Sequence, residues 1–455
     1  MDTIGRYRVT GRLGRGGMAT VYKALAPVTG RLVAIKLLRP RDVLLDLVGE
    51  EPLRRTFLDE ARIMGELNHP HLARILDCDS HEGRPFFVLE YYAHSLGTFI
   101  GEAYRAESPS RPVSVARARH YLRQALLGLE RLHFAGIVHR DIKPYNLMIT
   151  GDDRIKIIDF GLSRVRGEER GEGGRPPGMQ VGSPFYAAPE QNSDPQGVDG
   201  RADLYSVAVM ALRMLTGRLF VHRQELAALL DEVQATRGRR WREWLAKGLA
   251  RSPQERFADS REMRLALDGL PIAEGHGGQA PGGQAPGGAA WPSATLRRQP
   301  RRILYKEIRD ELGLDDLLRP RPYCRPRLVE AGPQTMLDQA TGLVWQRLGA
   351  GFLLDWRQAA QYVEQVNQRG EGGCRSWRLP TCEELRTVLP SPWEDLGEGR
   401  RLFDPSLHWL WSCDPSTSRQ AWSADVVEGF FERLDRDAAA SVCLVHDGAK
   451  RQGGR

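Results

Sequence analysis

Two short polar motifs near the middle of the chain constrain its fold and chemistry more than any other feature. The first is His139-Arg140-Asp141-Ile142-Lys143-Pro144-Tyr145-Asn146, and the second, Ile157-Ile158-Asp159-Phe160-Gly161, follows closely behind it. Carboxylates, an amide and a lysine in this order match the separate parts that a protein supplies for phosphoryl transfer. The two motifs therefore predict a site at which both loops act on a phosphoryl group.

Each polar side chain in these motifs has its own expected role. Asp141 would accept the proton of a substrate hydroxyl group and orient that group, while Lys143 would offset the charge of the γ-phosphate. Asn146 and Asp159 would hold magnesium. We therefore predict catalytic roles for the first two residues and metal ligation by the second two.

A glycine cluster near the N-terminus lies within the run Leu13-Gly14-Arg15-Gly16-Gly17-Met18-Ala19-Thr20-Val21-Tyr22. Glycines let the backbone fold closely over a polyphosphate and aim N–H donors at its oxygens. Taken alone, the cluster fits a hairpin turn better, but Val33-Ala34-Ile35-Lys36 downstream places a lysine inside an apolar strand. A buried lysine needs an anionic partner, and Glu60 is a fitting one.

Apolar periodicity predicts a small β-rich lobe followed by a larger helical lobe. Residues 7–40 show short and alternating apolar runs broken by glycines, which is typical of strands. Residues 54–68 have helical spacing, and strand-like sequence continues through residue 89. From about residue 114 to 270, leucines recur at intervals of three and four, as in amphipathic helices.

Together these residues resemble the eukaryotic-like (Hanks-type) protein kinases, particularly their bacterial serine/threonine branch. The resemblance covers residues 7–270 and implies an α+β bilobal fold with ATP between a β-rich N-lobe and a helical C-lobe. It also implies Mg²⁺, or Mn²⁺, as the metal, and the pairing of Lys36 with Glu60. The nucleotide contacts that it implies are Gly14, Gly16, Gly17, Val21, Ala34, Lys36, Leu89 as gatekeeper, and Glu90 and Tyr92 of the hinge.

The resemblance extends to the substrate side of the family. Lys143, two residues after Asp141, matches the serine/threonine pattern and implies protein substrates with Ser or Thr hydroxyl groups. The run from Gly182 to Glu190 matches the peptide-docking loop. Asp203 matches the aspartate that braces the catalytic loop, and Arg256 the arginine that pairs with Glu190.

The chain departs from the family pattern in its activation segment. Small changes are Ala19 and Ala208 in place of glycines and Ser183 in place of threonine. Between Arg164 and Gly182 there is no Ser, Thr or Tyr, so Arg140 has no obvious phosphate to bind. Either a partner or one of three glutamates (Glu168, Glu169 and Glu172) orders this loop, or it is simply disordered. The span from Asp203 to Arg256 is also shorter than in most members of the family. The alternative function for the chain is that of an inactive scaffold that binds a nucleotide.

A second, different region follows the helical lobe. Two Gly-Gly-Gln-Ala-Pro copies mark residues 271–298 as a flexible linker. Residues 299–330 are charged and rich in proline, and we interpret them as a connecting segment with a short helix at 302–318. Residues 331–447 are rich in tryptophan, with a helix at 356–368 burying Trp356, Ala360 and Val363, and Thr381 and Glu384 forming a capping box.

Two phrases in this region resemble the Lcl C-terminal family, small bacterial domains with a C-type-lectin-like α/β fold. They are Thr341-Gly342-Leu343-Val344-Trp345 and Trp377-Arg378-Leu379-Pro380-Thr381. The resemblance implies a module that binds an unknown ligand or protein, although Ser441 to His446 replace the arginine-bearing strand of the family. The tryptophans fit core packing better than a ligand cage, while aromatic residues near 409–431 could line a ligand surface.

Composition narrows the partners and the location. The formal charge is +7, but arginines are mixed with acids along the whole chain, so nucleic-acid binding is not expected. No apolar run approaches the ~20 residues of a membrane helix, and the first six residues lack the apolar segment of a secretory signal. We expect a cytoplasmic protein whose six cysteines, including Cys413 and Cys443, are free thiols.

Overall fold

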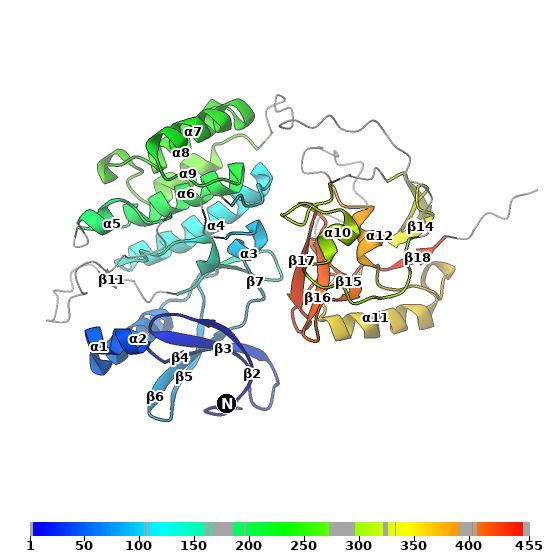
Figure 1. Cartoon of the computed structure of the whole chain (residues 1–455), viewed down its shortest axis with the longest axis horizontal. Helices are drawn as coiled ribbons and strands as arrows, with labels where there is room; N and C mark the ends of the chain where they lie inside the picture. Colours follow the sequence, from blue (N-terminus) through cyan, green and yellow to red (C-terminus); the bar gives the residue numbers. More distant parts are fainter. Residues whose placement is uncertain are drawn as a thin grey trace, which may run out of the picture. The chain divides into compact units, whose positions relative to one another are not determined.

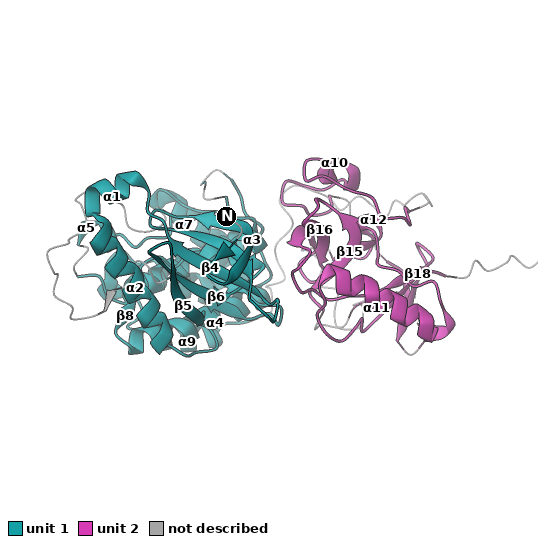
Figure 2. Ribbon diagram, turned by 90° about the horizontal axis from the view of Figure 1, so that it is seen from below, with its two compact units in different colours: residues 1–278 teal, residues 279–455 magenta. Residues whose placement is uncertain are grey.

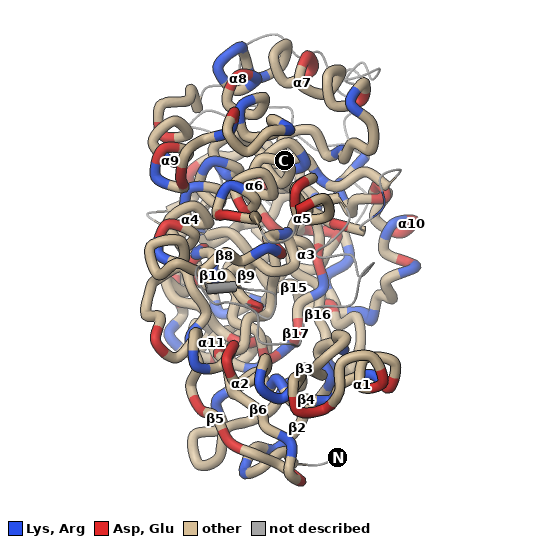
Figure 3. Tube along the Cα trace, turned by 90° about the vertical axis from the view of Figure 1, so that its left-hand side faces the viewer, with Lys and Arg blue, Asp and Glu red and all other residues tan. Residues whose placement is uncertain are grey.

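The computed structural model divides the chain into two compact units, residues 1–278 and 279–455 (Figure 2). The residues that it describes are 3–103, 105, 108–159, 164–165, 185–194, 197–272, 296–321, 326–332, 334–390, 403 and 407–448. Among them, no helix has the length and apolar character needed to cross a membrane. Basic and acidic residues are interspersed along the Cα trace (Figure 3).

The first unit begins with a six-stranded antiparallel sheet in the order β1-β2-β3-β4-β6-β5 (Figure 1). One face of this sheet packs into an apolar cluster that includes Tyr22, Ile35 and Val88. The helix predicted at 54–68 lies at 50–66 as α2 and packs against β5 and β6 through Phe57 and Phe87, whose ring centroids are 4.9 Å apart. The bounds are β1 (Thr3–Ile4), β2 (Tyr7–Arg15), β3 (Ala19–Leu25), β4 (Leu32–Leu38), α1 (Asp42–Val48), α2 (Glu50–Glu66), β5 (Ile75–His81) and β6 (Arg84–Glu90).

The remainder of the first unit is mainly helical, as the periodicity predicts (Figure 1). Helix α6 forms its centre, because every residue from Ala202 to Leu215 is buried. The helices are α3 (Leu96–Ile100), α4 (Val115–Phe134), α5 (Glu190–Ser193), α6 (Arg201–Thr216), α7 (Arg223–Arg237), α8 (Arg239–Gly248) and α9 (Ser260–Asp268), with short 3-10 turns η1 (Pro144–Asn146) and η2 (Pro253–Glu255). Two small sheets join β7 (His94–Ser95) with β9 (Leu147–Ile149) and β10 (Ile155–Ile157), and β8 (Ile137–Val138) with β11 (Arg164–Val165).

In its described residues, the second unit contains two antiparallel sheets and three α-helices. One sheet has the order β12-β13-β14-β18 and the other β15-β16-β17. The bounds are α10 (Ile308–Leu312), β12 (Leu328–Gly332), β13 (Thr335–Asp338), β14 (Leu343–Gln346), α11 (Trp356–Arg369), η3 (Glu371–Gly373), α12 (Cys382–Arg386), β15 (Trp409–Pro415), β16 (Gln420–Asp425), β17 (Phe430–Asp435) and β18 (Val445–Asp447). The predicted capping box of Thr381 and Glu384 is present at the start of α12.

The prediction of a separate connecting segment at 299–330 is wrong. Ile303, Ile308 and Leu312 are fully buried in the same apolar cluster as Leu385 and Trp422 of the second unit. The helix predicted over 302–318 is reduced to the five residues of α10. The segment is therefore part of the C-terminal fold rather than a connection to it.

Two predictions about apolar side chains in this unit also require correction. In α11 the half-buried Trp356 and Val363 pack against the core as predicted, but the fully buried residues are Ala359 and Val366 and Ala360 is exposed, so the prediction for Ala360 was wrong. Most of the aromatic residues suggested for a ligand surface are instead in the core: Trp411, Trp422, Phe430 and Phe431 are fully buried, whereas Trp409 is half-buried. Five described cysteines are free thiols, and Cys324 lies outside the described residues.

Candidate active site

Three elements of the first unit converge on Lys36. This lysine lies in β4, and its Nζ donates to Oε1 of Glu60 on α2 at 2.6 Å and to Oδ1 of Asp159 after β10 at 2.8 Å. The Glu60 side chain is 2% exposed and that of Lys36 12%, whereas the Asp159 side chain is 47% exposed. The predicted pairing of Lys36 with Glu60 thus exists in the structure, and its open side is at Asp159.

The charges in this cluster determine one another's protonation. Burial by itself would lower the pKa of Lys36, but Asp159 and Glu60 outweigh it and raise that pKa, so the lysine stays charged. The Lys36 ammonium in turn lowers the pKa of Asp159 to about 2. Burial raises the pKa of Glu60 against the opposing effect of Lys36. The exposed member, Asp159, is therefore the firmly anionic one.

The loop between β8 and β9 brings Asp141, Lys143 and Asn146 together. Nζ of Lys143 donates to Oδ2 of Asp141 at 2.7 Å, and Nδ2 of Asn146 donates to the same oxygen at 3.0 Å and to the Asp141 carbonyl at 2.8 Å. The 3-10 turn η1 provides this geometry because it folds Asn146 back over the aspartate. The amide nitrogen of Asn146 is thus engaged within the loop.

Asp203, at the start of α6, fixes the position of this loop. Its two carboxylate oxygens accept hydrogen bonds from the backbone N–H groups of His139 at 2.9 Å and Arg140 at 2.7 Å. Arg140 has a φ of +67°, a strained conformation for a non-glycine residue, and such strain persists only where surrounding bonds impose it. Burial would raise the pKa of Asp203, but hydrogen bonds and charge from His133 and His139 outweigh it and lower the pKa.

The residues predicted to contact a nucleotide share one face of the N-terminal sheet. Val21 is the cross-strand neighbour of Lys36, and Ala34 is the cross-strand neighbour of Leu89. Directly opposed residues in antiparallel strands point to the same side, and so do residues two apart along β4. Val21, Ala34, Lys36 and Leu89 therefore form a continuous surface above the catalytic loop residues.

The two ends of this surface are the glycine turn and the segment after β6. At Gly14 a side chain would meet nothing within 4 Å, so packing within the chain does not account for the glycine. Gly16 donates its N–H to the carbonyl of Ala19 at 2.8 Å across the turn that also contains Gly17. At the opposite end, the Tyr92 hydroxyl donates to Oε2 of Glu90 at 2.8 Å.

The side chains present fit a polyphosphate with a divalent cation. Among the described residues, none donates a hydrogen bond to Oδ2 of Asp159 or to Oδ1 of Asn146. A carboxylate and an amide oxygen with free lone pairs are the donor type that Mg²⁺ selects. The open glycine turn and the charged Lys36 supply complementary groups for phosphate oxygens.

The substrate side of the site is partly described. Arg256 makes a two-pronged ion pair with Glu190 at 2.6 and 2.8 Å, as the resemblance implies, and Nε2 of Gln191 donates to the Arg140 carbonyl at 2.8 Å. Phe160, Gly161, Ser183 and the three glutamates of the activation segment lie outside the described residues.

One buried cluster near the site was missed by the sequence reasoning. Arg213 on α6 and Glu102 after α3 form an ion pair with both side chains fully buried, with Nε to Oε2 at 2.9 Å. The Tyr186 hydroxyl donates to the same carboxylate at 2.6 Å, and the Tyr145 hydroxyl to the Glu102 carbonyl at 2.7 Å. The only signal was an arginine inside the apolar run Met210-Ala211-Leu212-Arg213-Met214.

Comparison with known proteins agrees with this geometry. The protein kinase domain model matches residues 7–257, and the Lcl C-terminal domain model matches residues 334–446. Serine/threonine-protein kinase Pkn1 of Myxococcus xanthus is 31% identical over 286 residues, which are 59% of this chain and 39% of that protein. PksC of Streptomyces coelicolor is 33% identical over 276 residues, 57% of this chain and 48% of that one.

Other relatives come from mycobacteria. PknL of Mycobacterium tuberculosis is 31% identical over 280 residues, 58% of this chain and 65% of that protein. The crystal structure of the PknI kinase domain from the same species has 26% identity and a TM-score of 0.43, and covers 58% of this chain and 96% of that one. The chain therefore spans less than two thirds of the length of the curated relatives described above.

Proposed function

The chain belongs to the protein kinase family, and on that premise we propose that it transfers the γ-phosphoryl group of ATP to serine or threonine hydroxyl groups of proteins. The observation that carries the proposal is the convergence of two lysines and three carboxylates on one site. Lys36 bonds Glu60 and Asp159, and Lys143 bonds Asp141. A nucleotide-binding scaffold without transfer is not favoured, because each of these charges is partnered as phosphoryl transfer requires.

In the proposed reaction, Asp141 accepts a hydrogen bond from the substrate hydroxyl group and takes up its proton as the new bond forms. Lys143, already within hydrogen-bond distance of Asp141, neutralises charge on the transferred group. Lys36, held by Glu60, binds the phosphates of the nucleotide. Asp141 and Lys143 thus orient the acceptor, while Lys36 and the glycine turn orient the donor.

The metal and the nucleotide have definite sites in this proposal. Asn146 and Asp159 would hold the Mg²⁺ ion, with Mn²⁺ as an alternative. When bound, the ion neutralises phosphate charge and so favours departure of the γ-phosphoryl group. Adenine lies against the surface of Val21, Ala34 and Leu89, and backbone groups from Glu90 to Tyr92 bind its edge. We assign this activity to residues 7–270.

The second unit serves in this proposal as a ligand- or partner-binding module. Its match to the Lcl C-terminal family and its compact fold support that role. Because 296–321 pack into its core, we extend the module from the predicted 331–447 to include them. The proposed activity does not require phosphorylation of the segment between Arg164 and Gly182, which contains no Ser, Thr or Tyr. The protein acts in the cytoplasm on Ser- or Thr-containing proteins; these two points rest on the sequence alone.

A phosphotransfer assay with γ-labelled ATP and a generic protein acceptor tests the proposal. The wild-type chain should label Ser or Thr residues, and Asp141→Asn should reduce the rate by at least about a thousandfold because it removes the proton acceptor. The matched control is Asp152→Asn, the same chemical change at a carboxylate with a 60% exposed side chain, which should leave the rate unchanged. Nucleotide binding without transfer by the wild-type chain would contradict the proposal.

A further inference from the structure

The second unit has a surface hollow of about 450 Å³ that no part of the proposed kinase reaction uses. This volume lies in the range of small-molecule sites in proteins. Most of its wall is apolar. The wall is formed by α11, the turn before α12, the end of β15 and the segment around residue 300. The apolar lining residues are Pro300, Trp356, Ala360, Leu379, Cys413 and Pro415.

The hollow exists because one wall position is small. Ala360 is exposed on α11 although the helix pattern placed it in the core, and a larger side chain there would fill the space. Trp356 on the same helix is fixed by its indole Nε1, which donates to the Ser412 carbonyl at 2.9 Å. The Arg436 guanidinium lies 4.3 Å from the centre of the Trp356 ring.

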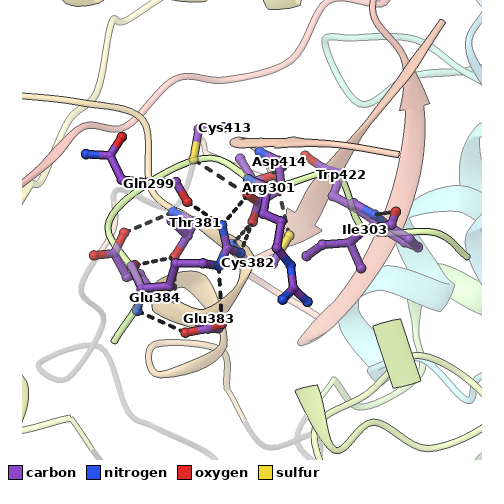
Figure 4. Close-up of polar contacts among 12 residues, drawn as sticks. Gln299, Arg301, Ile303, Thr381, Cys382, Glu383, Glu384, Cys413, Asp414 and Trp422 are labelled. Atoms are coloured by element: carbon purple, nitrogen blue, oxygen red, sulfur yellow. Dashed lines mark hydrogen bonds and ion pairs between the residues drawn. The ribbon is translucent and has the colours of Figure 1, made fainter. Parts of the chain in front are cut away.

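The opposite wall is equally well fixed. Arg297 binds both carboxylate oxygens of Asp414 at 2.8 Å, and the backbone N–H of Arg301 donates to Asp414 at 2.9 Å. Figure 4 shows Arg301 beside Asp414 and Cys382, with Cys413 at the edge of the same group. Since these contacts hold 297–301 against β15, the hollow is preformed and a ligand would not have to order it.

The charged side chains that line the hollow are both basic. Its two remaining lining residues are Arg301 and Arg302, and no lining residue is acidic. Arg301 pairs with Glu311, but Arg302 uses only its Nε, which donates to the Ser416 carbonyl at 3.2 Å. Among the described residues, the two terminal nitrogens of Arg302 have no partner. Burial and the Asp414 charge raise the pKa of the Cys413 thiol, so the wall beside the arginine stays neutral.

We propose that this hollow binds a small amphipathic anion, an aromatic or branched aliphatic carboxylate. Its apolar body packs on Trp356, Leu379 and the Cys413 thiol, and its carboxylate accepts hydrogen bonds from the terminal nitrogens of Arg302. A guanidinium group presents parallel donors that match a carboxylate, which favours this class over neutral ligands. The inference concerns the second unit and does not depend on the kinase activity of the first.

Titration of the full-length chain with 2-naphthoate, followed by calorimetry, tests the proposal. Saturable binding at one site is expected, with the neutral analogue 2-naphthamide at least about tenfold weaker because it lacks the charge that Arg302 recognises. Arg302→Gln should weaken naphthoate about tenfold and leave naphthamide unchanged. Equal affinity for the acid and the amide, or no saturable binding of either, would overturn the proposal.

A second pair of variants locates the site. Ala360→Trp should abolish naphthoate binding by filling the hollow, whereas Gln361→Trp, the next exposed residue on the same helix, should bind like the wild-type chain. The thermal unfolding midpoint of each variant shows whether it folds. Unchanged binding by a folded Ala360→Trp chain would place the ligand elsewhere and refute the assignment.

Discussion

At the scale of single residues, the candidate active site carries more negative than positive charge. Lys36 and Lys143 face Glu60, Asp141 and Asp159, and every one of these groups except Asp159 is largely buried. A polyphosphate would add further negative charge, which the two lysines cannot balance alone. A divalent cation held by Asp159 and Asn146 would reduce this excess, so we expect nucleotide binding as well as phosphotransfer to depend on the metal.

The role of Glu60 can be tested by a neutral replacement. In Glu60→Gln, Lys36 loses its ion pair with Glu60 and keeps only the one with Asp159. The ammonium group should then be misplaced, which should reduce kcat/KM for ATP by about a hundredfold. The measurement is steady-state phosphotransfer against ATP concentration. Glu66→Gln, on the exposed end of the same helix, is the matched control and should behave like the wild-type chain. Equal kinetics for both variants would refute a positioning role for Glu60.

Asp203 should make a large contribution to stability because its carboxylate is fully buried and holds two backbone N–H groups. Asp203→Asn should lower the free energy of unfolding of the first unit by about 3 kcal/mol. Asp231→Asn, an exposed carboxylate on α7, should change it by less than about 0.5 kcal/mol. Denaturant titration monitored by tryptophan fluorescence measures both.

The pH dependence of this contribution has a definite sign. The pKa of Asp203 is lowered in the folded protein, so its stabilising effect is complete above the pKa of the unfolded chain, near ~3.9, and is lost as pH falls through the folded value. The stability difference between wild-type and Asp203→Asn chains should thus be constant from pH 7 to about 5 and shrink below ~4. A difference that grew in acid would contradict this.

At the scale of elements, α6 shows how a buried helix can carry charge. All of its residues from Ala202 to Leu215 are buried, and it holds Asp203 at one end and Arg213 near the other. Arg213 also donates to the carbonyls of Gly217 and Ser108, so it ties the end of α6 to the chain between α3 and α4. The two charges connect this central helix to the catalytic loop and to Tyr186 through Glu102.

The Arg213 and Glu102 pair should be strongly coupled. Arg213→Met leaves the Glu102 carboxylate buried without a counter-charge, which should cost roughly 3–5 kcal/mol of unfolding free energy. The double variant Glu102→Gln, Arg213→Met removes both charges and should recover most of that loss. Arg242→Met, which breaks the exposed pair with Asp231, is the control and should cost less than about 1 kcal/mol. Additive losses in the double variant would show that the two charges act independently.

Some features of these elements could be predicted from the sequence and others could not. The catalytic residues could be predicted because phosphoryl transfer demands particular side chains at fixed spacing, as at Asp141 and Asn146. In α11, the alanines at 359 and 360 make two possible buried faces equally apolar. The sequence does not decide between them, and only packing against the sheet buries Ala359. The role of Glu102 could not be predicted, because no local sequence pattern indicates that its partner, Arg213, lies more than a hundred residues away.

At the scale of the whole molecule, the least predictable feature is where the second unit begins. The segment from 296 to 321 looks like a tether because arginines, acids and prolines interrupt its apolar residues without a regular period. In the structure it is attached at both ends: Arg297 binds buried Asp414, and Leu318 accepts a backbone hydrogen bond from Phe431 at 3.0 Å. The match to the Lcl C-terminal family starts only at residue 334 and therefore does not cover this segment.

This attachment predicts different behaviour for two C-terminal fragments. A fragment of residues 296–448 retains Ile303, Ile308, Leu312 and Leu318 in the core and should unfold in one cooperative thermal transition. A fragment of 326–448 exposes the apolar surface that these residues cover, and each lost side chain withdraws about 1.5–3 kcal/mol of burial, so it should aggregate or lack a transition. Calorimetry and near-UV circular dichroism of both fragments measure this.

Single substitutions within the 296–448 fragment distinguish the contribution of apolar packing from that of the buried ion pair. Ile303→Ala removes apolar packing and should destabilise the fragment by about 2–5 kcal/mol. Arg297→Ala leaves the fully buried Asp414 carboxylate without its counter-charge and should cost about 3–5 kcal/mol. Arg309→Ala, an exposed residue of α10, is the control. If 326–448 alone matched 296–448 in midpoint and cooperativity, the segment would be a passive tether after all, and the hollow bounded by Pro300 and Arg302 would lose its fixed wall.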